Sequence, residues 1–282
     1  MAGPYVDDPM TPPPLRLLSS VLLINLLTAT VVATPAQARV AATQPARPKL
    51  VVLIAIDGLP QRQVLSYRTQ LAPDGFNRFL QRGSWFANAH YGHAFTVTAA
   101  GHATMLTGAY PHRTGIIGNE WRDNQTGQSE YCTGDTSATY IGHPTNPLDG
   151  TSPKNLKVET LGDVLRRANP QSRVIALSGK DRGAILPAGK TGTAYMYMSS
   201  TGQFASSTYY MPQHPAWVNA FNAARPADRY FKMEWKALLP EAAYAQSLPD
   251  NQPWFGPAGG GLPARFSAPD DQVPGPNFYG SL

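Results

Sequence analysis

The sequence predicts an α/β fold, in which strands buried on both faces alternate with amphipathic helices. Three observations favour this class. A continuous apolar run from Leu50 to Ile56 is typical of a strand in a covered sheet, and the turn Asp57-Gly58-Leu59-Pro60 follows it. A helical pattern comes next, between Pro73 and Arg82. The same alternation of helix and apolar strand returns between Val158 and Leu177.

The residues before the first strand are typical of an export signal. An apolar run from Leu17 to Ala33 follows Arg16, and Ala36-Gln37-Ala38 offers the small residues that signal peptidase requires. We therefore expect a signal peptide over residues 1–38 and a periplasmic or secreted protein. Met10 is an alternative start, because the acidic residues before it suit a signal poorly. A retained membrane anchor is the less favoured alternative, so no stable anchor is expected.

The rest of the chain is expected to form a polar linker, residues 39–48, and one domain, residues 49–282. Without the signal, the chain has 22 basic and 16 acidic residues, a net charge of +6. This balance attracts anions modestly but forms no dense basic stripe, so we expect no nucleic-acid partner. Cys132 is the only cysteine, which excludes an internal disulfide, and nothing supports it as a thiol nucleophile.

Two amphipathic helices are predicted in the first two thirds of the chain. The helix over residues 73–82 would end at Gly83, and the helix over residues 158–168 would precede a buried strand over residues 173–177. The apolar residues expected to face inward from these helices are Phe76, Phe79 and Leu80 in the first and Leu161, Val164 and Leu165 in the second.

The later part of the chain is predicted to be less regular. Tyr195 to Met198, with Ser199 to Gly202 after it, indicates a hairpin, and residues 215–224 a helix. Residues 249–282 are so rich in glycine and proline that we expect no regular element there. A domain that ends in such a connection suggests a polypeptide cut short within a larger fold.

Polar residues follow the predicted strands in an order that suits phosphoryl transfer. Asp57 comes directly after a strand, where a sheet of this class gathers metal-binding carboxylates. Thr98 precedes a helical stretch, Gly101 to Leu106, so that its hydroxyl lies at a helix N-terminus. Thr96 is the second choice as nucleophile. An oxyanion also needs donors, and the candidates are Asn119, Lys180 and Arg182.

Each of these residues also has an ordinary structural explanation when it is taken alone. Asp57 and Asn119 are common turn residues, and Thr98 is a common helix cap. Lys180 and Arg182 would point the same way in extended chain, but isolated cations are usually solvated. Only their combination and order favour a catalytic site.

With these residues in place, the sequence resembles the alkaline phosphatase superfamily, in its type I phosphodiesterase and nucleotide pyrophosphatase-like branch. It is most similar there to the phosphate-irrepressible alkaline phosphatases. The resemblance implies an α/β/α sandwich of the alkaline phosphatase type, truncated within the fold. The matching stretches are Val51 to Gly58, Thr96 to Ala103, Gly108 to Gly115, Gly118-Asn119 and Lys180-Asp181-Arg182.

The resemblance also implies roles for the matching residues. Asp57 would bind one of two zinc ions, and Thr98 would be both a metal ligand and the phosphorylated nucleophile. Asn119, Lys180 and Arg182 would contact the nonbridging phosphoryl oxygens. Because the diesterases of the family lack the two cations, Lys180 and Arg182 favour a small phosphate monoester as substrate. Nucleotide pyrophosphatase or phosphodiesterase activity is the alternative.

One part of the family pattern is missing. The two-zinc site is completed in the family by an Asp-x-x-x-His motif, an Asp-His pair and a further histidine. Between Arg182 and Leu282 the chain has neither motif, and His214 is its only histidine there. Since a two-metal site stabilises the attacking and leaving oxygens together, we expect the chain alone to be inactive.

Two further readings remain open. The chain is either half of a split phosphatase, with a separately encoded C-terminal half, or a noncatalytic remnant that at most binds phosphate. Histidines near Thr98 offer a different metal site, because His90 and His93 have the spacing of a chelating pair and His102 and His112 lie nearby in sequence. For His102 and His112, packing and loop hydrogen bonds are the favoured roles.

Overall fold

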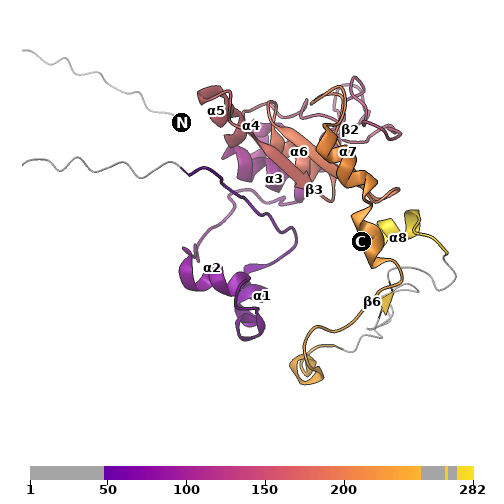
Figure 1. The fold of residues 1–282 in the computed structure, drawn as a ribbon. Coiled ribbons are helices and arrows are strands. Elements are labelled where there is room, and N and C mark those ends of the chain that lie inside the picture. Colours follow the sequence, from indigo (N-terminus) through magenta and orange to yellow (C-terminus); the bar gives the residue numbers. More distant parts are fainter. Residues whose placement is uncertain (1–47, 249–263, 266–271) are drawn as a thin grey trace, which may run out of the picture. The chain divides into compact units, whose positions relative to one another are not determined.

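The computed structural model describes residues 48–248, 264–265 and 272–282 (Figure 1). The chain divides after Ile54 into two units, and all the elements named below lie in the second unit, Ala55 to Leu282. The predicted signal peptide, residues 1–38, lies outside the described residues. No helix in the described part combines the length and the apolar character that crossing a bilayer requires.

A three-stranded sheet carries the strand, helix, strand unit that the sequence predicts. Strand β3 (Ile175–Ser178) pairs in parallel with β4 (Thr193–Met198), and β4 pairs antiparallel with β5 (Gln203–Ala205). Parallel neighbours need a crossover connection, which is provided by helix α6 (Asp181–Ala188). The antiparallel pair is the predicted hairpin, so this prediction is confirmed.

Helices contact both faces of this sheet. Ala194 and Met196 of β4 pack against the apolar side of α6. Tyr195 points to the opposite face, because side chains alternate along a strand. Its ring meets the edge of Trp217 in helix α7 (Ala216–Ala223), with 5.3 Å between the ring centroids. This helix, sheet, helix arrangement confirms the predicted α/β class.

A second helical layer lies against α6. Helix α3 (Thr98–Thr107) contacts α6, and the two share a core in which Ala99 and Ala103 pack near Leu186 (Figure 1). Cys132 belongs to the same core and follows a two-stranded hairpin of β1 (Glu120–Arg122) and β2 (Ser129–Tyr131). The hairpin, α3 and α6 therefore form one packed group.

The remaining elements are short. The helices are α1 (Gln61–Ser66), α2 (Phe76–Arg82), α4 (Pro111–Thr114), α5 (Leu161–Ala168) and α8 (Pro276–Ser281), and the 3₁₀ turns are Arg68–Gln70, Pro226–Tyr230 and Glu241–Tyr244. Strands β6 (Glu234–Trp235) and β7 (Ala264–Arg265) pair antiparallel.

The C-terminal segment differs from the prediction. Residues 249–282 were expected to contain no regular element, yet α8 forms there, as does β7. Pro276 occupies the first turn of α8, where its missing N–H costs nothing, and Phe278 and Tyr279 are buried. Residues 249–263 and 266–271, to which the same prediction applied, lie outside the described residues.

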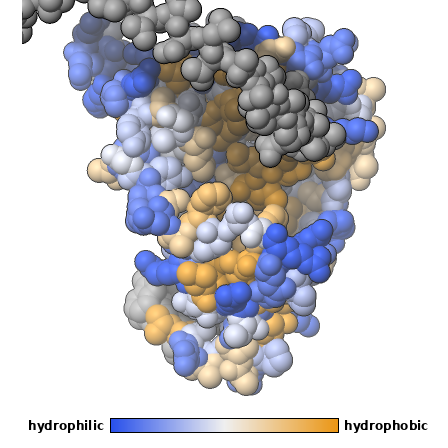
Figure 2. All heavy atoms as spheres, turned by 90° about the vertical axis from the view of Figure 1, so that its left-hand side faces the viewer, coloured by the Kyte–Doolittle hydropathy of each residue, from blue (hydrophilic) through white to orange (hydrophobic). Residues whose placement is uncertain are grey.

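Several predicted inward faces are exposed, so these predictions are wrong for the described structure. Leu50 to Ile56 forms no strand, and no described strand pairs with it. Among the side chains expected to be buried, Leu161 is 67% exposed and Leu177 61%. Figure 2 shows hydrophobic residues gathered on one face of the molecule. The other exposed members of the predicted faces are Val164, Leu165, Ile175, Phe76 and Phe79.

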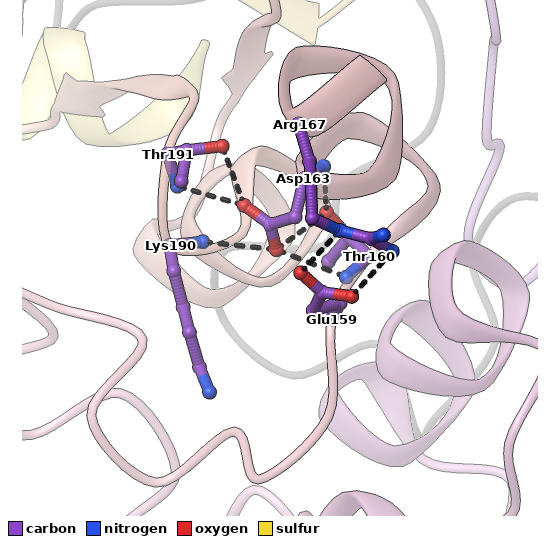
Figure 3. Close-up of polar contacts among 6 residues, drawn as sticks. All are labelled: Glu159, Thr160, Asp163, Arg167, Lys190 and Thr191. Carbon is purple, nitrogen blue, oxygen red and sulfur yellow. Dashed lines mark hydrogen bonds and ion pairs between the residues drawn. The ribbon is translucent and has the colours of Figure 1, made fainter.

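Helix α5 is held instead by a buried carboxylate, Asp163, which is 2% exposed (Figure 3). Thr160 caps the helix, and Asp163 accepts hydrogen bonds from the backbone and hydroxyl of Thr160. It also accepts from the backbone of Lys190 and from the backbone and hydroxyl of Thr191. Asp163 thereby ties the start of α5 to the loop between α6 and β4.

Candidate active site

Thr98 is the first residue of α3, as the sequence predicts. Val97 before it is extended, so the unpaired N–H groups of the first helical turn begin at this point. The Thr98 hydroxyl donates a hydrogen bond to Asp57 Oδ2 at 2.7 Å. The two residues are 41 positions apart, and the fold brings together the predicted metal ligand and the predicted nucleophile. Thr96, the second candidate, is exposed and lies outside the helix.

Asn119 lies against the same helix terminus. Its Oδ1 accepts a hydrogen bond from the backbone N–H of Ala99 at 3.0 Å, so its amide nitrogen is the group left to donate. Its own carbonyl accepts from the backbone N–H of Cys132 at 3.0 Å. Asp57, Thr98 and Asn119 therefore meet at the start of α3.

Lys180 and Arg182 lie at the start of the neighbouring helix. Lys180 is the N-cap of α6, and Arg182 is in its first turn. The sequence analysis expected both to point the same way only in extended chain. Lys180 is extended, but Arg182 is helical, so that condition is not met. No direct hydrogen bond joins either cation to Thr98 among the described residues.

The two helix starts are nevertheless neighbours. His102, one turn into α3, donates a hydrogen bond from its Nδ1 to the carbonyl oxygen of Thr98 at 2.8 Å. Its Nε2 lies 4.0 Å from the position that a Cβ on Gly183 would take, and Gly183 is in the first turns of α6. Two helix N-termini side by side favour an anion, because the partial positive charges of both dipoles add.

Arg182 has a partner that the sequence analysis missed. Its Nη1 donates to the hydroxyl of Tyr131 at 2.8 Å, and this hydroxyl donates to Asp181 Oδ1 at 2.8 Å. Arg182 Nε is buried and has no hydrogen-bond partner within the described residues. Tyr131 stands outside every matched motif, 50 positions from Asp181, so no local pattern marked it.

The surroundings of Arg182 and Tyr131 favour a charged guanidinium and a neutral phenol. Burial would lower the pKa of Arg182, but the hydrogen bond that it donates to Tyr131 and the nearby acidic groups raise it. Burial raises the pKa of Tyr131, and the charge of Asp181 adds to that effect. Burial and the charge of Asp181 also raise the pKa of Cys132 to about 12. Its thiol is therefore neutral near pH 7 and unsuited to act as a nucleophile.

Arg182 and Lys180 line a cavity of about 590 Å³ together with Tyr131, His143 and Asp149. Its size suits a small ligand. Burial lowers the pKa of His143, so this histidine adds little positive charge at neutral pH. The positive charge facing the cavity comes from Lys180, which is exposed, and Arg182, which is partly buried.

The described residues do not complete a metal site. Asp57 and Thr98 offer two oxygen ligands at one point, but no group of three His, Cys, Asp or Glu side chains comes together in the part of the chain that the structure describes. The alternative metal site among the histidines near Thr98 is not formed by the described residues either. His90 contacts Asn88, and His102 is buried and bonded within α3, as expected for a packing residue.

Comparison with known proteins gives a consistent set of relatives. A family model described as Type I phosphodiesterase / nucleotide pyrophosphatase matches residues 51–272. Alkaline phosphatase PhoV of Synechococcus elongatus is 44% identical over 212 residues, which cover 74% of this chain and 38% of PhoV. Alkaline phosphatase PafA of Elizabethkingia meningoseptica is 39% identical over 212 residues, which cover 74% of this chain and 39% of PafA.

A solved structure is also similar. It is a crystal structure of a PafA variant with one threonine, one asparagine, one lysine and one arginine substituted. The TM-score is 0.67 at 35% sequence identity, and the match covers 70% of this chain and 39% of that chain. The chain thus spans less than two fifths of the length of these relatives.

Proposed function

Because the chain belongs to the type I phosphodiesterase / nucleotide pyrophosphatase family, within the alkaline phosphatase superfamily, we propose that it carries the nucleophile half of a phosphate monoester hydrolase. In this proposal the Thr98 hydroxyl attacks the phosphorus atom of a small phosphate monoester. The observation that carries the proposal is the contact of Thr98 Oγ1 with Asp57 Oδ2, 2.7 Å apart at the N-terminus of α3.

The reaction takes two steps. Thr98 Oγ forms a bond to phosphorus, the bond from phosphorus to the ester oxygen breaks, and the hydroxyl proton is balanced by protonation of the leaving alcohol. Water then attacks the phosphothreonine, which releases orthophosphate and restores the Thr98 hydroxyl. A threonine hydroxyl is a poor nucleophile near neutral pH, so the hydrogen bond to Asp57 orients it without supplying enough activation.

The donors around the phosphoryl group act mainly by position and charge. Asn119 would donate through its amide nitrogen, since its oxygen is held by Ala99. Lys180 and Arg182 would neutralise the equatorial oxygens, which carry most of the charge in a loose transition state. Support comes from the PafA variant, in which the substituted threonine and asparagine are as far apart as Thr98 and Asn119, and the lysine and arginine are two apart.

The same cations favour monoesters over the rival substrates. A monoester brings a dianionic group, whereas a diester or a nucleotide pyrophosphate presents an esterified oxygen and less charge at the reacting phosphorus. Once a polypeptide with the missing ligand motifs restores turnover, we therefore expect Lys180→Ala to slow hydrolysis of an aryl phosphate more than that of an aryl phosphodiester. Equal losses would favour the phosphodiesterase or nucleotide pyrophosphatase alternative.

Zinc is the metal that the family resemblance implies, with Asp57 and Thr98 as the ligands from this chain. When bound, zinc would supply the positive charge that ionises an alcohol. The described residues do not fit a complete zinc site, because no group of three His, Cys, Asp or Glu side chains comes together among them. We therefore assign no step to zinc and expect the chain alone to be inactive.

The proposal also covers the domain organisation, the location and the partner of the enzyme. Residues 1–38 would be an export signal, residues 39–48 a linker and residues 49–282 the N-terminal part of the catalytic domain, in a periplasmic or secreted protein. The partner would be a separately encoded C-terminal half that supplies the remaining ligands. The candidate from a different class is a noncatalytic phosphate-binding remnant, which is favoured by the absence of Asp-x-x-x-His and Asp-His after Arg182.

Complementation tests the proposal. The chain is mixed with zinc and a polypeptide that carries the missing ligand motifs, and release of 4-nitrophenolate from its phosphate ester is followed. Turnover should appear only in the mixture, Thr98→Ala should abolish it, and Thr96→Ala should retain it. Turnover that survives Thr98→Ala would exclude this nucleophile, and brisk turnover by the chelator-treated chain alone would exclude the need for a metal.

A further inference from the structure

Tyr131 makes two hydrogen bonds that join neighbouring residues of α6. Its hydroxyl accepts from Arg182 Nη1 and donates to Asp181 Oδ1, both at 2.8 Å. Asp181 and Arg182 are adjacent on the helix, and adjacent side chains there do not face each other. A hydroxyl from β2 is therefore what connects the carboxylate to the guanidinium.

From this geometry we infer that Tyr131 is a positioning residue that aims the Arg182 guanidinium at a phosphate dianion. The inference rests on the proposed function, because it assigns Arg182 to the bound oxyanion. It adds a residue outside the motifs that carry the resemblance. The rest of the guanidinium then remains for the ligand.

Only a tyrosine can fill this position among the aromatic residues of similar shape. A phenol has one O–H donor and lone pairs to accept, and here Asp181 takes the donor. The proton is thus directed away from Arg182, so that the oxygen presents a lone pair to Nη1. Phenylalanine offers neither function, although it fills nearly the same volume. The raised pKa of Tyr131, caused by burial and then by the charge of Asp181, keeps this proton in place at neutral and mildly alkaline pH.

Tyr131 also connects Arg182 to the other half of the site. The residue after it, Cys132, donates its backbone N–H to the carbonyl of Asn119 at 3.0 Å. Asn119 in turn accepts from Ala99 in the first turn of α3. A continuous chain of contacts therefore runs from the helix that begins at Thr98, through Asn119 and β2, to Arg182. The separation of nucleophile and guanidinium depends on this chain.

The position of the Asp181 carboxylate depends on the absence of a side chain at Gly150. A Cβ on Gly150 would overlap Asp181 Oδ2 and Thr133 Oγ1, so only glycine leaves Asp181 its present place. Gly150→Ala should displace Asp181 and release the Tyr131 hydroxyl without touching Tyr131 or Arg182. This gives a second way to disturb the network, independent of substitution at the tyrosine.

The first measurement needs no ligand. Nitrogen-detected NMR of the full chain follows rotation of the Arg182 guanidinium, whose signal is identified by its loss in Arg182→Lys. Rotation should be slow in the natural chain and at least about tenfold faster in Tyr131→Phe, because one hydrogen bond to a charged group is lost. Gly150→Ala should show intermediate rotation. Unchanged rotation in Tyr131→Phe would overturn the inference.

The second measurement uses inorganic phosphate at pH 8.5, titrated into the full chain by calorimetry. Tyr131→Phe should weaken binding about tenfold. In the Arg182→Ala variant, Tyr131→Phe should weaken phosphate binding by less than about twofold further, because the tyrosine acts through the arginine. Additive losses would indicate a general structural effect and overturn the inference.

A matched control separates positioning from the loss of any buried hydroxyl. The Tyr210 hydroxyl contacts the carbonyl of Gly189, at the opposite end of α6. Tyr210→Phe should leave both guanidinium rotation and phosphate affinity unchanged. Failure of the natural chain to bind phosphate would count against the proposed function, whereas the rotation measurement still decides the role of Tyr131.

Discussion

At the residue scale, Asn119 makes a structural contact with one atom of its side chain and has a proposed chemical role for another. Its oxygen accepts from the N–H of Ala99, a fully buried residue, and its nitrogen is the candidate donor to a phosphoryl oxygen. The two roles use different atoms of the amide. Substitutions that change one atom and keep the other can therefore separate them.

We expect Asn119→Ala to lower the free energy of unfolding by about 1–3 kcal/mol, because the buried N–H of Ala99 loses its acceptor. Asn119→Asp keeps an acceptor at a helix N-terminus, so its stability should equal or exceed that of the natural chain. Both should weaken phosphate binding, Asp more strongly through charge repulsion. Urea unfolding and calorimetry measure the two effects. Strong phosphate binding by Asn119→Asp would contradict the donor role.

Candidate residues could be chosen from the sequence by their place next to predicted elements, but their side-chain contacts could not be predicted. Asp57, Thr98 and Asn119 could be chosen from the sequence because each follows a predicted strand, starts a helix or ends a turn. The contact of Tyr131 with Arg182 could not, because it joins positions 51 apart and depends on how β2 packs on α6. The helical start at Asp181 was not predicted, because α6 has no proline or strong cap residue inside this motif to mark it.

At the element scale, periodicity located helices α2, α5 and α7 and strands β3 and β4, but it did not predict which of their side chains are buried. The amphipathic pattern placed Leu161, Val164 and Leu165 toward a core, and they are exposed because no described element covers that side of α5. Leu50 to Ile56 is apolar enough for a central strand and has no described strand beside it. A pattern shows which side can be buried, whereas burial requires a partner.

The difference between an exposed and a buried leucine predicts different losses in the free energy of unfolding for helices α5 and α6. Leu165 of α5 is 49% exposed, and Leu186 of α6 is fully buried. Leu186→Ala should lower the free energy of unfolding by about 2–5 kcal/mol, because it leaves a cavity. Leu165→Ala should change it by less than about 0.5 kcal/mol. Urea unfolding of both variants gives the comparison. Similar losses would show that α5 is covered in solution.

The Asp163 network predicts acid sensitivity at the start of α5 (Figure 3). Burial would raise the pKa of Asp163, but hydrogen bonds from Thr160, Thr191 and Lys190 outweigh it and hold the pKa below its ordinary value. Its stabilising effect is therefore present above about pH 4 and is lost as the pH falls through the lowered pKa. Asp163→Asn should destabilise the fold by about 2 kcal/mol at pH 7, because an NH₂ group would face N–H donors.

The same variant should flatten the pH dependence of unfolding between about pH 5 and pH 2. Glu159→Gln is the matched control, since the exposed ion pair between Glu159, just before the cap of α5, and Arg167 in α5 should contribute less than about 0.5 kcal/mol. Chemical denaturation across this pH range measures both. An unchanged acid slope in Asp163→Asn would assign acid sensitivity to other carboxylates.

At the scale of the whole molecule, the residues that we propose for the reaction gather mainly at two helix starts. The starts of α3 and α6 provide a hydroxyl, an amide and two cations, and Asp57 provides a single carboxylate. Metal ligands do not gather around this carboxylate within the described residues. The proposed binding of phosphate and the proposed binding of zinc can therefore be tested separately.

Zinc should accordingly leave the stability of the chain alone almost unchanged. A specific site at a metal concentration one hundred times its Kd would add about 2.7 kcal/mol, so thermal melts with zinc and with chelator would differ clearly if such a site existed. The difference should appear only when a polypeptide with the missing ligand motifs is added, and Asp57→Ala should remove it. Zinc stabilisation of the chain alone that survives Asp57→Ala but is lost in His90→Ala would instead place the metal among the upstream histidines, apart from Thr98.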